Sequence, residues 1–480
     1  MIQNIIGRNV EKQILLDRLH SSDSEFIVVY GRRRIGKTYL IEQVYDQNIR
    51  FHLAGEKNAD NDQHLALFCK QFKKYTKQIV TAKNKPTTWI EAFELLEIIF
   101  TKKKSVKKMV FFFDEIAWLA KDNSDFMIAF SQFWNSWANK RKDIILIVCS
   151  SNASWMVKRL IQDKGSLYKR VTQNIRLQQF TLAETELFLK SRKINFLRYQ
   201  ILQLYMVFGG VAFYLKQLRK DFSIEQNIQH LCFVKDALLK DEYEILLESI
   251  FDYKINHRLF MDTLAANPSG LSYPELLRKA KVPSGGSASV VLEELTQSGF
   301  VKFHVPYQKL KRDGIYRMVD EYCLFHHKFM KAKSGMSLSW RNITQTNSFK
   351  IWAGFAFEAI CLKDIHMPAI AKALGISDVS YATNSWYVPA KNKAEGFQID
   401  MLIDRMDKVI NVCEIKFTEG KFIMTKNYAA QLKSKIEKFK STLKNKKYII
   451  TTIISVNGIQ PNIYTKSLVE RSLEIEELFI

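Results

Sequence analysis

The stretch FIVVYGRRRIGKTYLIEQV, residues 26–44, decides the fold of the N-terminal part of this chain. It begins with an apolar run that favours a buried strand, and after Thr38 it continues with apolar residues at helical spacing. Between these runs stands the pattern Gly-x-x-x-x-Gly-Lys-Thr, from Gly31 to Thr38. A strand before this pattern and a helix after it are the context of a phosphate-binding loop. The stretch therefore predicts a nucleotide site in an α/β domain built on a parallel sheet.

Each part of this loop has an expected chemical role. The glycines let backbone N–H groups turn toward the β-phosphate, and the start of the helix adds partial positive charge. Lys37 is expected to reach the β- and γ-phosphates, and Thr38 is expected to ligate Mg²⁺. The residues predicted to bind ATP here are Gly31, Arg32, Arg33, Arg34, Ile35, Gly36, Lys37 and Thr38. The three arginines leave two alternatives open: they point into solvent or onto a neighbouring domain, or one of them meets the nucleotide or a carboxylate.

A second apolar run, MVFFF at 109–113, is followed directly by Asp114 and Glu115. Asp114 is expected to hold Mg²⁺ through water, and Glu115 is expected to orient and deprotonate the water that attacks the γ-phosphate. A third run, IILIVC, leads to Ser151 and Asn152. Either residue could contact the γ-phosphate or the attacking water, although turn chemistry explains both equally well.

The composition of the chain indicates a polyanionic partner. The 480 residues carry a formal net charge of +23, and nucleic acid, DNA in particular, is the expected partner. No segment has the roughly 20 uninterrupted apolar residues that a bilayer-spanning helix needs, so no membrane partner is expected. The N-terminal residues do not resemble a secretory signal, and the six scattered cysteines contain no CxxC pair. We therefore expect a cytoplasmic protein with reduced thiols.

The chain is too long for one hydrophobic core, and its pattern changes along its length. Four parts are predicted: a P-loop core at 1–175, a helical lid at 176–240, a winged helix-turn-helix at 245–325 and an α/β domain at 340–480. In the third part, Ser272 and Glu275 form a capping-box pattern that opens a helix. The following helix is expected to bury one face, formed by Ala288, Val291, Leu292 and Leu295. The alternative for this part is a helical connector without a nucleic-acid role.

The segment GFQIDMLIDRMDKVINVCEIKF, residues 396–417, predicts a β-hairpin with its turn centred on Asp407. In that register Asp400 lies opposite Glu414, and Lys416 shares their face of the sheet. Two facing carboxylates repel each other unless a cation or a proton lies between them, and Mg²⁺ is the natural cation. Lys416 could stabilise the negative charge that develops on a phosphate. A structural salt bridge across the strands is the alternative.

The sequence resembles the archaeal-type ATPase family, a branch of the AAA+ and related P-loop ATPases, along nearly its whole length. The resemblance rests on GRRRIGKT, an early Gly7-Arg8, FFFDE, LYKRVTQNIRL at 167–177 and YMVFGGVAFYL. It implies that Gly7 and Arg8 lie near the adenine and that Arg170 is a sensor or finger arginine. The sequence departs from the family where Lys169 replaces a usual glycine and Ala212 a usual proline.

The hairpin residues resemble the core of PD-(D/E)xK nucleases. That resemblance implies metal ligation by Asp400, Glu414 and Glu358, the last in the preceding helix, with Lys416 as a catalytic residue. Together the sequence predicts an Mg²⁺-dependent ATPase joined to a nucleic-acid-directed, nuclease-like module. A regulatory ATP switch with a catalytically silent C-terminal domain is the alternative. Whether the chain forms a homo-oligomer or binds a protein partner stays open.

Overall fold

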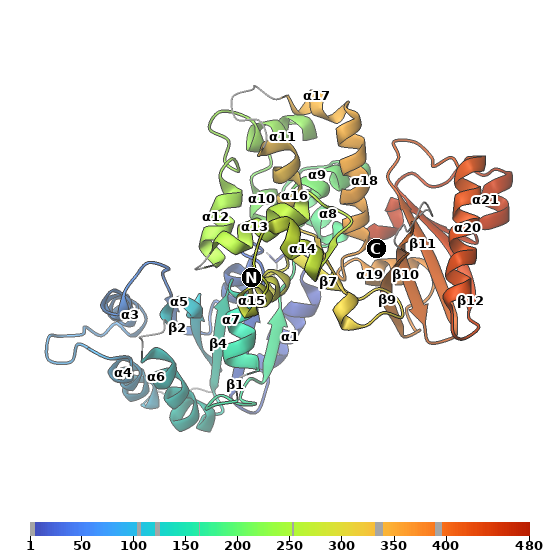
Figure 1. The fold of residues 1–480 in the computed structure, drawn as a ribbon. Helices are drawn as coiled ribbons and strands as arrows, with labels where there is room; N and C mark the ends of the chain where they lie inside the picture. Colours follow the sequence, from blue (N-terminus) through green and yellow to red (C-terminus); the bar gives the residue numbers. More distant parts are fainter. Residues whose placement is uncertain are drawn as a thin grey trace. The chain divides into compact units, whose positions relative to one another are not determined.

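A computed structural model describes residues 5–102, 107–120, 125–162, 164–251, 254–331, 339–388 and 396–480 (Figure 1). The chain separates into two compact units. One comprises residues 1–179 with 248–252, and the other comprises residues 180–247 with 253–480. In the described parts of the chain, no helix is both long and apolar enough to cross a membrane.

The first unit is built on a five-stranded sheet in the order β2-β3-β4-β1-β5, with every neighbouring pair parallel. Its strands are β1 (Glu25–Tyr30), β2 (Ile49–Ala54), β3 (Met109–Asp114), β4 (Ile144–Ser150) and β5 (Gln173–Arg176). The three strands predicted from apolar runs are β1, β3 and β4, which form the centre of the sheet and are buried almost throughout. The predicted parallel α/β core is therefore confirmed.

Helices cover both faces of this sheet. Successive side chains of β1 point to opposite faces, so they pack in two separate hydrophobic cores. Ile27 and Val29 pack with α1 and α2, whereas Phe26 and Val28 pack in an aromatic-rich core with α3, α4 and α6. The helices and helical turns of this unit are α1 (Asn9–Leu19), α2 (Lys37–Tyr45), α3 (Asn61–Thr76), α4 (Trp89–Thr101), α5 (Ile116–Leu119), α6 (Phe126–Gln132), η2 (Phe133–Trp137), η3 (Ala138–Lys140), α7 (Ala153–Met156) and η4 (Val157–Ile161).

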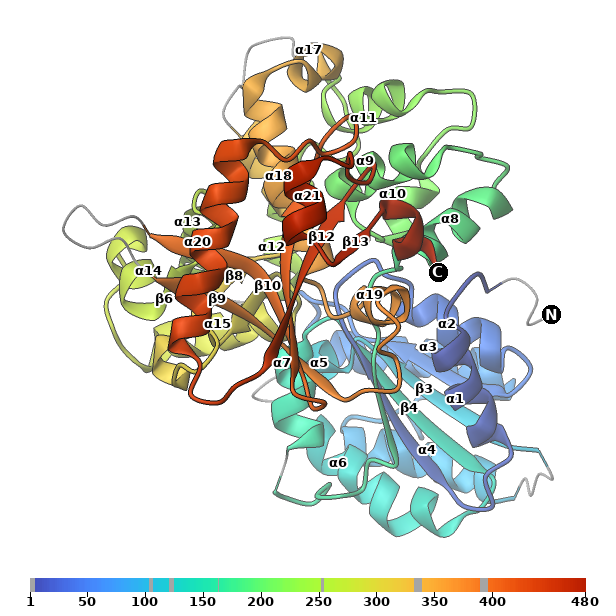
Figure 2. The same ribbon diagram turned by 90° about the vertical axis from the view of Figure 1, so that its right-hand side faces the viewer.

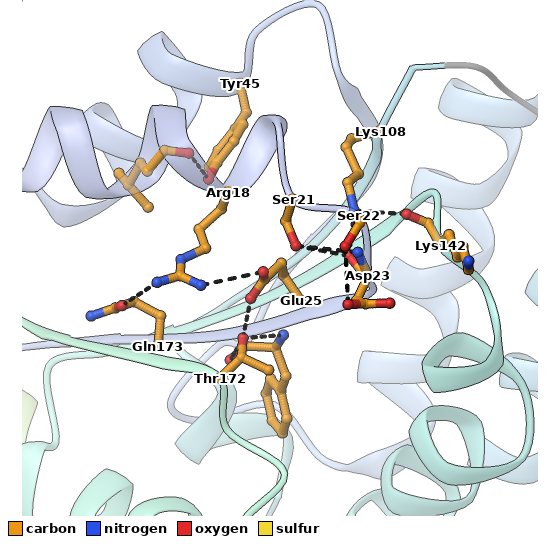
Figure 3. A network of polar contacts seen from close by, with 12 residues as sticks. Arg18, Ser21, Ser22, Asp23, Glu25, Tyr45, Lys108, Lys142, Thr172 and Gln173 are labelled. Atoms are coloured by element: carbon orange, nitrogen blue, oxygen red, sulfur yellow. Dashed lines mark hydrogen bonds and ion pairs between the residues drawn. The ribbon is translucent and has the colours of Figure 1, made fainter.

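A polar network ties the start of β1 to its neighbours, at the end of the strand opposite the phosphate loop (Figure 3). Glu25, only 4% exposed, accepts hydrogen bonds from Arg18 at 3.3 Å and from the hydroxyl of Thr172. Arg18 also donates to Gln173 at 3.0 Å. The network joins α1, β1 and the segment that leads into β5, so it fixes the base of the sheet.

The second unit begins with a group of helices: α8 (Leu182–Ser191), α9 (Arg198–Phe208), α10 (Ala212–Lys216) and α11 (Ile224–Cys232). The next helix, α12 (Glu242–Ile250), begins in this unit and ends within residues 248–252 of the first. The Gly209-Gly210 pair lies between the end of α9 and the start of α10. A Cβ atom on Gly210 would stand 2.0 Å from the carbonyl oxygen of Phe180, whose N–H donates to the Gly210 carbonyl at 2.8 Å. The close backbone contact therefore requires glycine at this position.

A small sheet and three helices follow. They are α13 (Lys254–Ala265), β6 (Leu271–Ser272), α14 (Tyr273–Ala280), α15 (Gly286–Gln297), β7 (Val301–His304), η5 (Lys311–Asp313) and β8 (Ile315–Met318), with the strands in the order β6-β8-β7. Glu275 accepts hydrogen bonds from the backbone and the hydroxyl of Ser272 at 3.1 and 2.6 Å, as the capping pattern predicts. The predicted apolar face of α15 is buried. Assignment of this part as a winged helix-turn-helix remains a prediction.

The C-terminal sheet has the order β13-β12-β11-β10-β9, with α18 and α20 on opposite faces (Figures 1 and 2). Its strands are β9 (Tyr381–Val388), β10 (Phe397–Arg405), β11 (Val409–Lys416), β12 (Tyr448–Ser455) and β13 (Arg471–Leu473). The helices and helical turns in this part are α16 (Glu321–Phe325), η6 (His326–Met330), α17 (Trp340–Thr344), α18 (Asn347–Cys361), α19 (Met367–Ala373), α20 (Lys426–Thr442), α21 (Ile463–Leu468) and η7 (Ile475–Phe479).

Candidate functional site

The phosphate loop, residues 31–36, connects β1 to α2. Gly31 has a φ of 149°, and a Cβ atom there would stand 2.1 Å from the carbonyl oxygen of Leu177. Gly36 precedes α2 in a left-handed conformation with a φ of 95°. Any other residue type would be strained at either position. The backbone itself therefore requires both glycines of the motif.

Lys37 lies folded over the loop that precedes it. Its Nζ donates hydrogen bonds to the carbonyl oxygens of Gly31 at 3.0 Å and Arg32 at 3.1 Å, and the residue is 6% exposed. The ammonium group is thus held at the loop, where it can bind phosphate oxygens as a point charge.

Thr38 and Asp114 come together at the carboxyl end of β3. The Thr38 hydroxyl donates to Asp114 Oδ2 at 2.6 Å, and Asp114 Oδ1 accepts from the backbone N–H of Glu115 at 2.9 Å. Hydroxyl and carboxylate oxygens are the ligands that Mg²⁺ prefers, and it commonly keeps several waters as well. The two residues that the sequence assigned to Mg²⁺ therefore fit that ion beside the phosphate loop.

Glu115 is held by the neighbouring strand end. Its Oε2 accepts from the hydroxyl of Ser150 at 3.1 Å and from the N–H and hydroxyl of Ser151 at 2.9 and 3.0 Å. Asn152 instead caps α7 by accepting from the N–H of Trp155 at 3.0 Å. The sequence pattern assigned no contact to Ser150. The parallel pairing of β3 with β4 puts these serines next to Glu115.

Arg8, which follows Gly7, contacts the phosphate loop. Gly7 and Arg8 have positive φ angles, 65° and 56°, and Arg8 Nη2 donates to the carbonyl oxygen of Ile35 at 3.4 Å. Arg32 is 7% exposed, which excludes the solvated alternative for this side chain. Arg33 and Arg34 are partly exposed.

Arg170 is exposed, and its backbone N–H donates to the carbonyl oxygen of Leu167 at 3.0 Å. No described contact brings its side chain to the phosphate loop within the first unit. Its role as a sensor or finger arginine stays a prediction.

The C-terminal hairpin has the predicted register. Met401 pairs with Cys413 and Asp404 pairs with Ile410, so Asp400 and Glu414 fall opposite one another. Lys416 Nζ lies 3.7 Å from Asp400 Oδ2 and 3.2 Å from Glu414 Oε2. The three residues that the sequence grouped are therefore close together.

Two residues of α20 that the sequence analysis missed complete the surroundings of Glu414. Lys435 donates to Glu414 Oε1 at 2.6 Å, and the hydroxyl of Tyr428 donates to Oε2 at 2.8 Å. Their separation of two helical turns could have indicated that they share one face of the helix. Both carboxylate oxygens of Glu414 are thus already engaged by donors.

The two facing carboxylates have opposite pKa shifts. Burial, and next the charges of Glu414 and Glu358, raise the pKa of Asp400 to about 7. Burial alone would also raise the pKa of Glu414, but Lys416 and Lys435 outweigh it and lower that pKa. One proton or cation shared with Asp400 therefore suffices to relieve the repulsion.

Glu358 has a different partner. It comes from α18, on the other side of the sheet, and its Oε1 accepts from Arg317 Nη1 of β8 at 2.7 Å. Across the described residues, no group of three or more His, Cys, Asp or Glu side chains is arranged so that it could hold a metal ion. The arrangement of Asp400, Glu414 and Glu358 as it stands therefore does not fit the predicted metal centre.

Comparisons with known proteins agree with the geometry of the first unit. Residues 6–218 match a family described as an ATPase domain predominantly from Archaea. An uncharacterized protein of Methanocaldococcus jannaschii is 24% identical over 264 residues, which are 54% of this chain and 54% of that protein. The chain thus aligns with about half the length of this curated relative.

Solved structures also resemble the fold. A Walker-type ATPase of Pyrococcus abyssi is 14% identical with a TM-score of 0.50, and the match covers 68% of this chain and 97% of that one. The ORC2 protein of Aeropyrum pernix is 14% identical with a TM-score of 0.44, over 68% and 95% of the two chains. The family match confirms the prediction of an ATPase domain in residues 6–218, and the Pyrococcus abyssi structure shows a similar fold.

Proposed function

We propose that this protein is an Mg²⁺-dependent ATPase whose nucleotide cycle controls a nucleic-acid-directed module formed by residues 245–325 and 340–480. The observation that carries the ATPase part is the contact of Thr38 with Asp114 at 2.6 Å, beside a Glu115 that three donors hold in place. These residues supply the two elements that γ-phosphate hydrolysis needs, a metal position and a positioned base.

The residues divide the chemistry among them. Lys37 and the loop N–H groups bind the β- and γ-phosphates, while Thr38 and Asp114 hold the metal ion, which neutralises phosphate charge when bound. Glu115 accepts a proton from the attacking water, and Ser150 and Ser151 fix the direction of its carboxylate. Arg170 is exposed and could act on a nucleotide bound to a second copy.

Nucleic acid is the proposed partner because of the chain's charge. A formal net charge of +23 is far beyond what solubility requires, and phosphates neutralise lysine and arginine with release of counterions. The helix and strand order of residues 254–318 supports a winged helix-turn-helix as one contact surface.

Two roles remain for the C-terminal sheet. One is strand cleavage at the grouped Asp400, Glu414 and Lys416, which would require these side chains to rearrange around a metal ion. The other is a catalytically silent domain in a regulatory ATP switch. The hydrogen bonds from Lys435 and Tyr428 to Glu414 favour this role, because a metal ion at Glu414 would have to displace these donors.

One preparation can test these proposals together. ATP turnover and cleavage of labelled DNA are measured with and without Mg²⁺, for the wild type, Lys37→Ala and Asp400→Asn. We expect Mg²⁺-dependent ATP turnover that only Lys37→Ala abolishes. Cleavage that Asp400→Asn removes would support the nuclease role, and an absence of cleavage would favour the switch. Wild-type protein that does not hydrolyse ATP would contradict the proposed function.

A further inference from the structure

The second unit contains a cavity of about 580 Å³ between the small sheet and the C-terminal sheet. One wall includes Lys302, His304 and Arg317 of β7 and β8, and the other includes Ser385 and Asp400 of β9 and β10. The volume lies within the range of small-molecule sites in proteins. The cavity is therefore large enough for part of a nucleotide strand.

Arg317 is the central feature of this cavity. It is 4% exposed, and its ion pair with Glu358 uses only the Nη1 atom of the guanidinium group. Arg317 Nη2 is buried without a hydrogen-bond partner among the residues that the structure describes. A guanidinium group stays protonated and can only donate, so a buried free N–H requires an acceptor from a ligand or water.

A second residue that lines the cavity also has a buried polar atom without a hydrogen-bond partner among the described residues. Ser385 Oγ is also buried without a partner in the described part of the chain. It lies on the opposite wall from Arg317, on the strand that pairs with β10. Two unsatisfied groups that can donate thus line one cavity.

The charges around the cavity indicate the class of ligand. Burial, followed by the charges of Arg317 and Lys302, lowers the pKa of His304 to about 4, so this side chain is neutral at pH 7. Lys302 already donates to Asp364 at 2.7 Å and to the Leu362 carbonyl oxygen at 2.8 Å. Arg317 also pairs with a carboxylate, that of Glu358, but its Nη2 stays without a partner among the described residues, and its planar group matches phosphate oxygens.

Aromatic side chains favour a nucleotide over a simple anion. Tyr387 and Phe397 also line the cavity, and aromatic rings stack with bases of any sequence. Glu275 and Asp400 also line the cavity, and their carboxylates oppose a multiply charged anion, whereas a phosphodiester carries a single charge and can turn its esterified oxygens toward them.

We infer that this cavity binds one phosphodiester of a nucleic-acid strand, with Arg317 Nη2 and Ser385 Oγ donating to its non-bridging oxygens. The inference rests on the proposed nucleic-acid-directed function and names its contact point. It places the strand beside Asp400 and makes the β7–β8 hairpin part of the C-terminal site.

Calorimetric titration of the full chain with the dinucleotide d(TpT), in EDTA and without ATP, tests the inference. Arg317→Lys keeps a cation for Glu358 but loses the second nitrogen. Ser385→Ala removes no internal hydrogen bond, so the protein should fold normally. We expect each variant to weaken d(TpT) binding about tenfold, as for loss of one hydrogen bond to a charged group. Arg312→Met, an exposed change between β7 and β8 but outside the cavity lining, should change the affinity less than about twofold.

Three outcomes would overturn the inference: no d(TpT) binding by the wild type, unchanged binding by both cavity variants, or tighter binding of AMP than of d(TpT). Binding of a long DNA duplex is measured in parallel. If the duplex binds and d(TpT) does not, only the cavity inference fails. If neither binds, the proposed nucleic-acid function fails with it.

Discussion

Glu115, the proposed base, shows how one side chain depends on residues from the next strand. The sequence identified it from its place after a buried strand, and it left Ser151 or Asn152 as a candidate contact of the γ-phosphate or attacking water, with turn chemistry as the alternative. The structure instead has both Ser150 and Ser151 donating to the Glu115 carboxylate. We therefore expect these serines to position the proposed base.

Replacing both serines, Ser150→Ala with Ser151→Ala, should lower the turnover of ATP about tenfold, because the carboxylate loses two of its three donors while the loop stays intact. ATP affinity should stay within about twofold, since neither serine belongs to the phosphate loop. Steady-state turnover and equilibrium nucleotide binding measure the two effects. Ser136→Ala, an exposed change in the same unit, is the control. Unchanged turnover in the double variant would contradict the positioning role.

Among the helices and strands, local sequence patterns predicted those features that depend on residues close together in the chain. The strand, loop and helix of the phosphate site follow from one continuous stretch, and the hairpin register follows from a turn centred on Asp407. The contacts of Glu414 with α20 and of Glu358 with β8 join residues far apart in sequence. No periodicity encodes such contacts, because they depend on how whole elements pack.

Helix α19 provides a pH-sensitive element. His366, which precedes it, is 1% exposed, and neither ring nitrogen has a hydrogen-bond partner among the described residues. Its ring packs edge-on against Tyr205, with the centroids 5.4 Å apart. Burial, and then the charge of Lys363, lower the pKa of His366 to about 3. The folded chain therefore keeps this histidine neutral.

Because the unfolded chain binds a proton at His366 near pH 6.5 and the folded chain does not, this group's contribution to stability is complete above that pH and falls as the pH drops toward 3. At pH 5 the loss is about 2 kcal/mol. His366→Phe should remove this loss, so the variant's Tm should fall less than that of the wild type between pH 7.5 and pH 5. Other buried histidines titrate equally in both proteins. Parallel Tm curves for the two proteins would contradict the buried neutral state.

At the scale of the whole molecule, the positive charge should make nucleic-acid binding depend on salt. Neutralising about six phosphates gives a log–log slope near −5 for duplex DNA, with little dependence on sequence. Fluorescence anisotropy of a labelled duplex across a salt series measures this slope. A slope near zero, or no binding at low salt, would favour a protein-binding switch instead.

The central claim is that ATP bound at Gly31–Thr38 is hydrolysed with Glu115 as the base. Its most direct test is one measurement of ATP binding and turnover, with Mg²⁺, for the wild type, Lys37→Ala and Glu115→Gln. Lys37→Ala should abolish nucleotide binding. Glu115→Gln should keep binding and lose about two or more orders of magnitude in turnover, as expected when a positioned base is removed. Hydrolysis by Glu115→Gln at the wild-type rate would contradict the account.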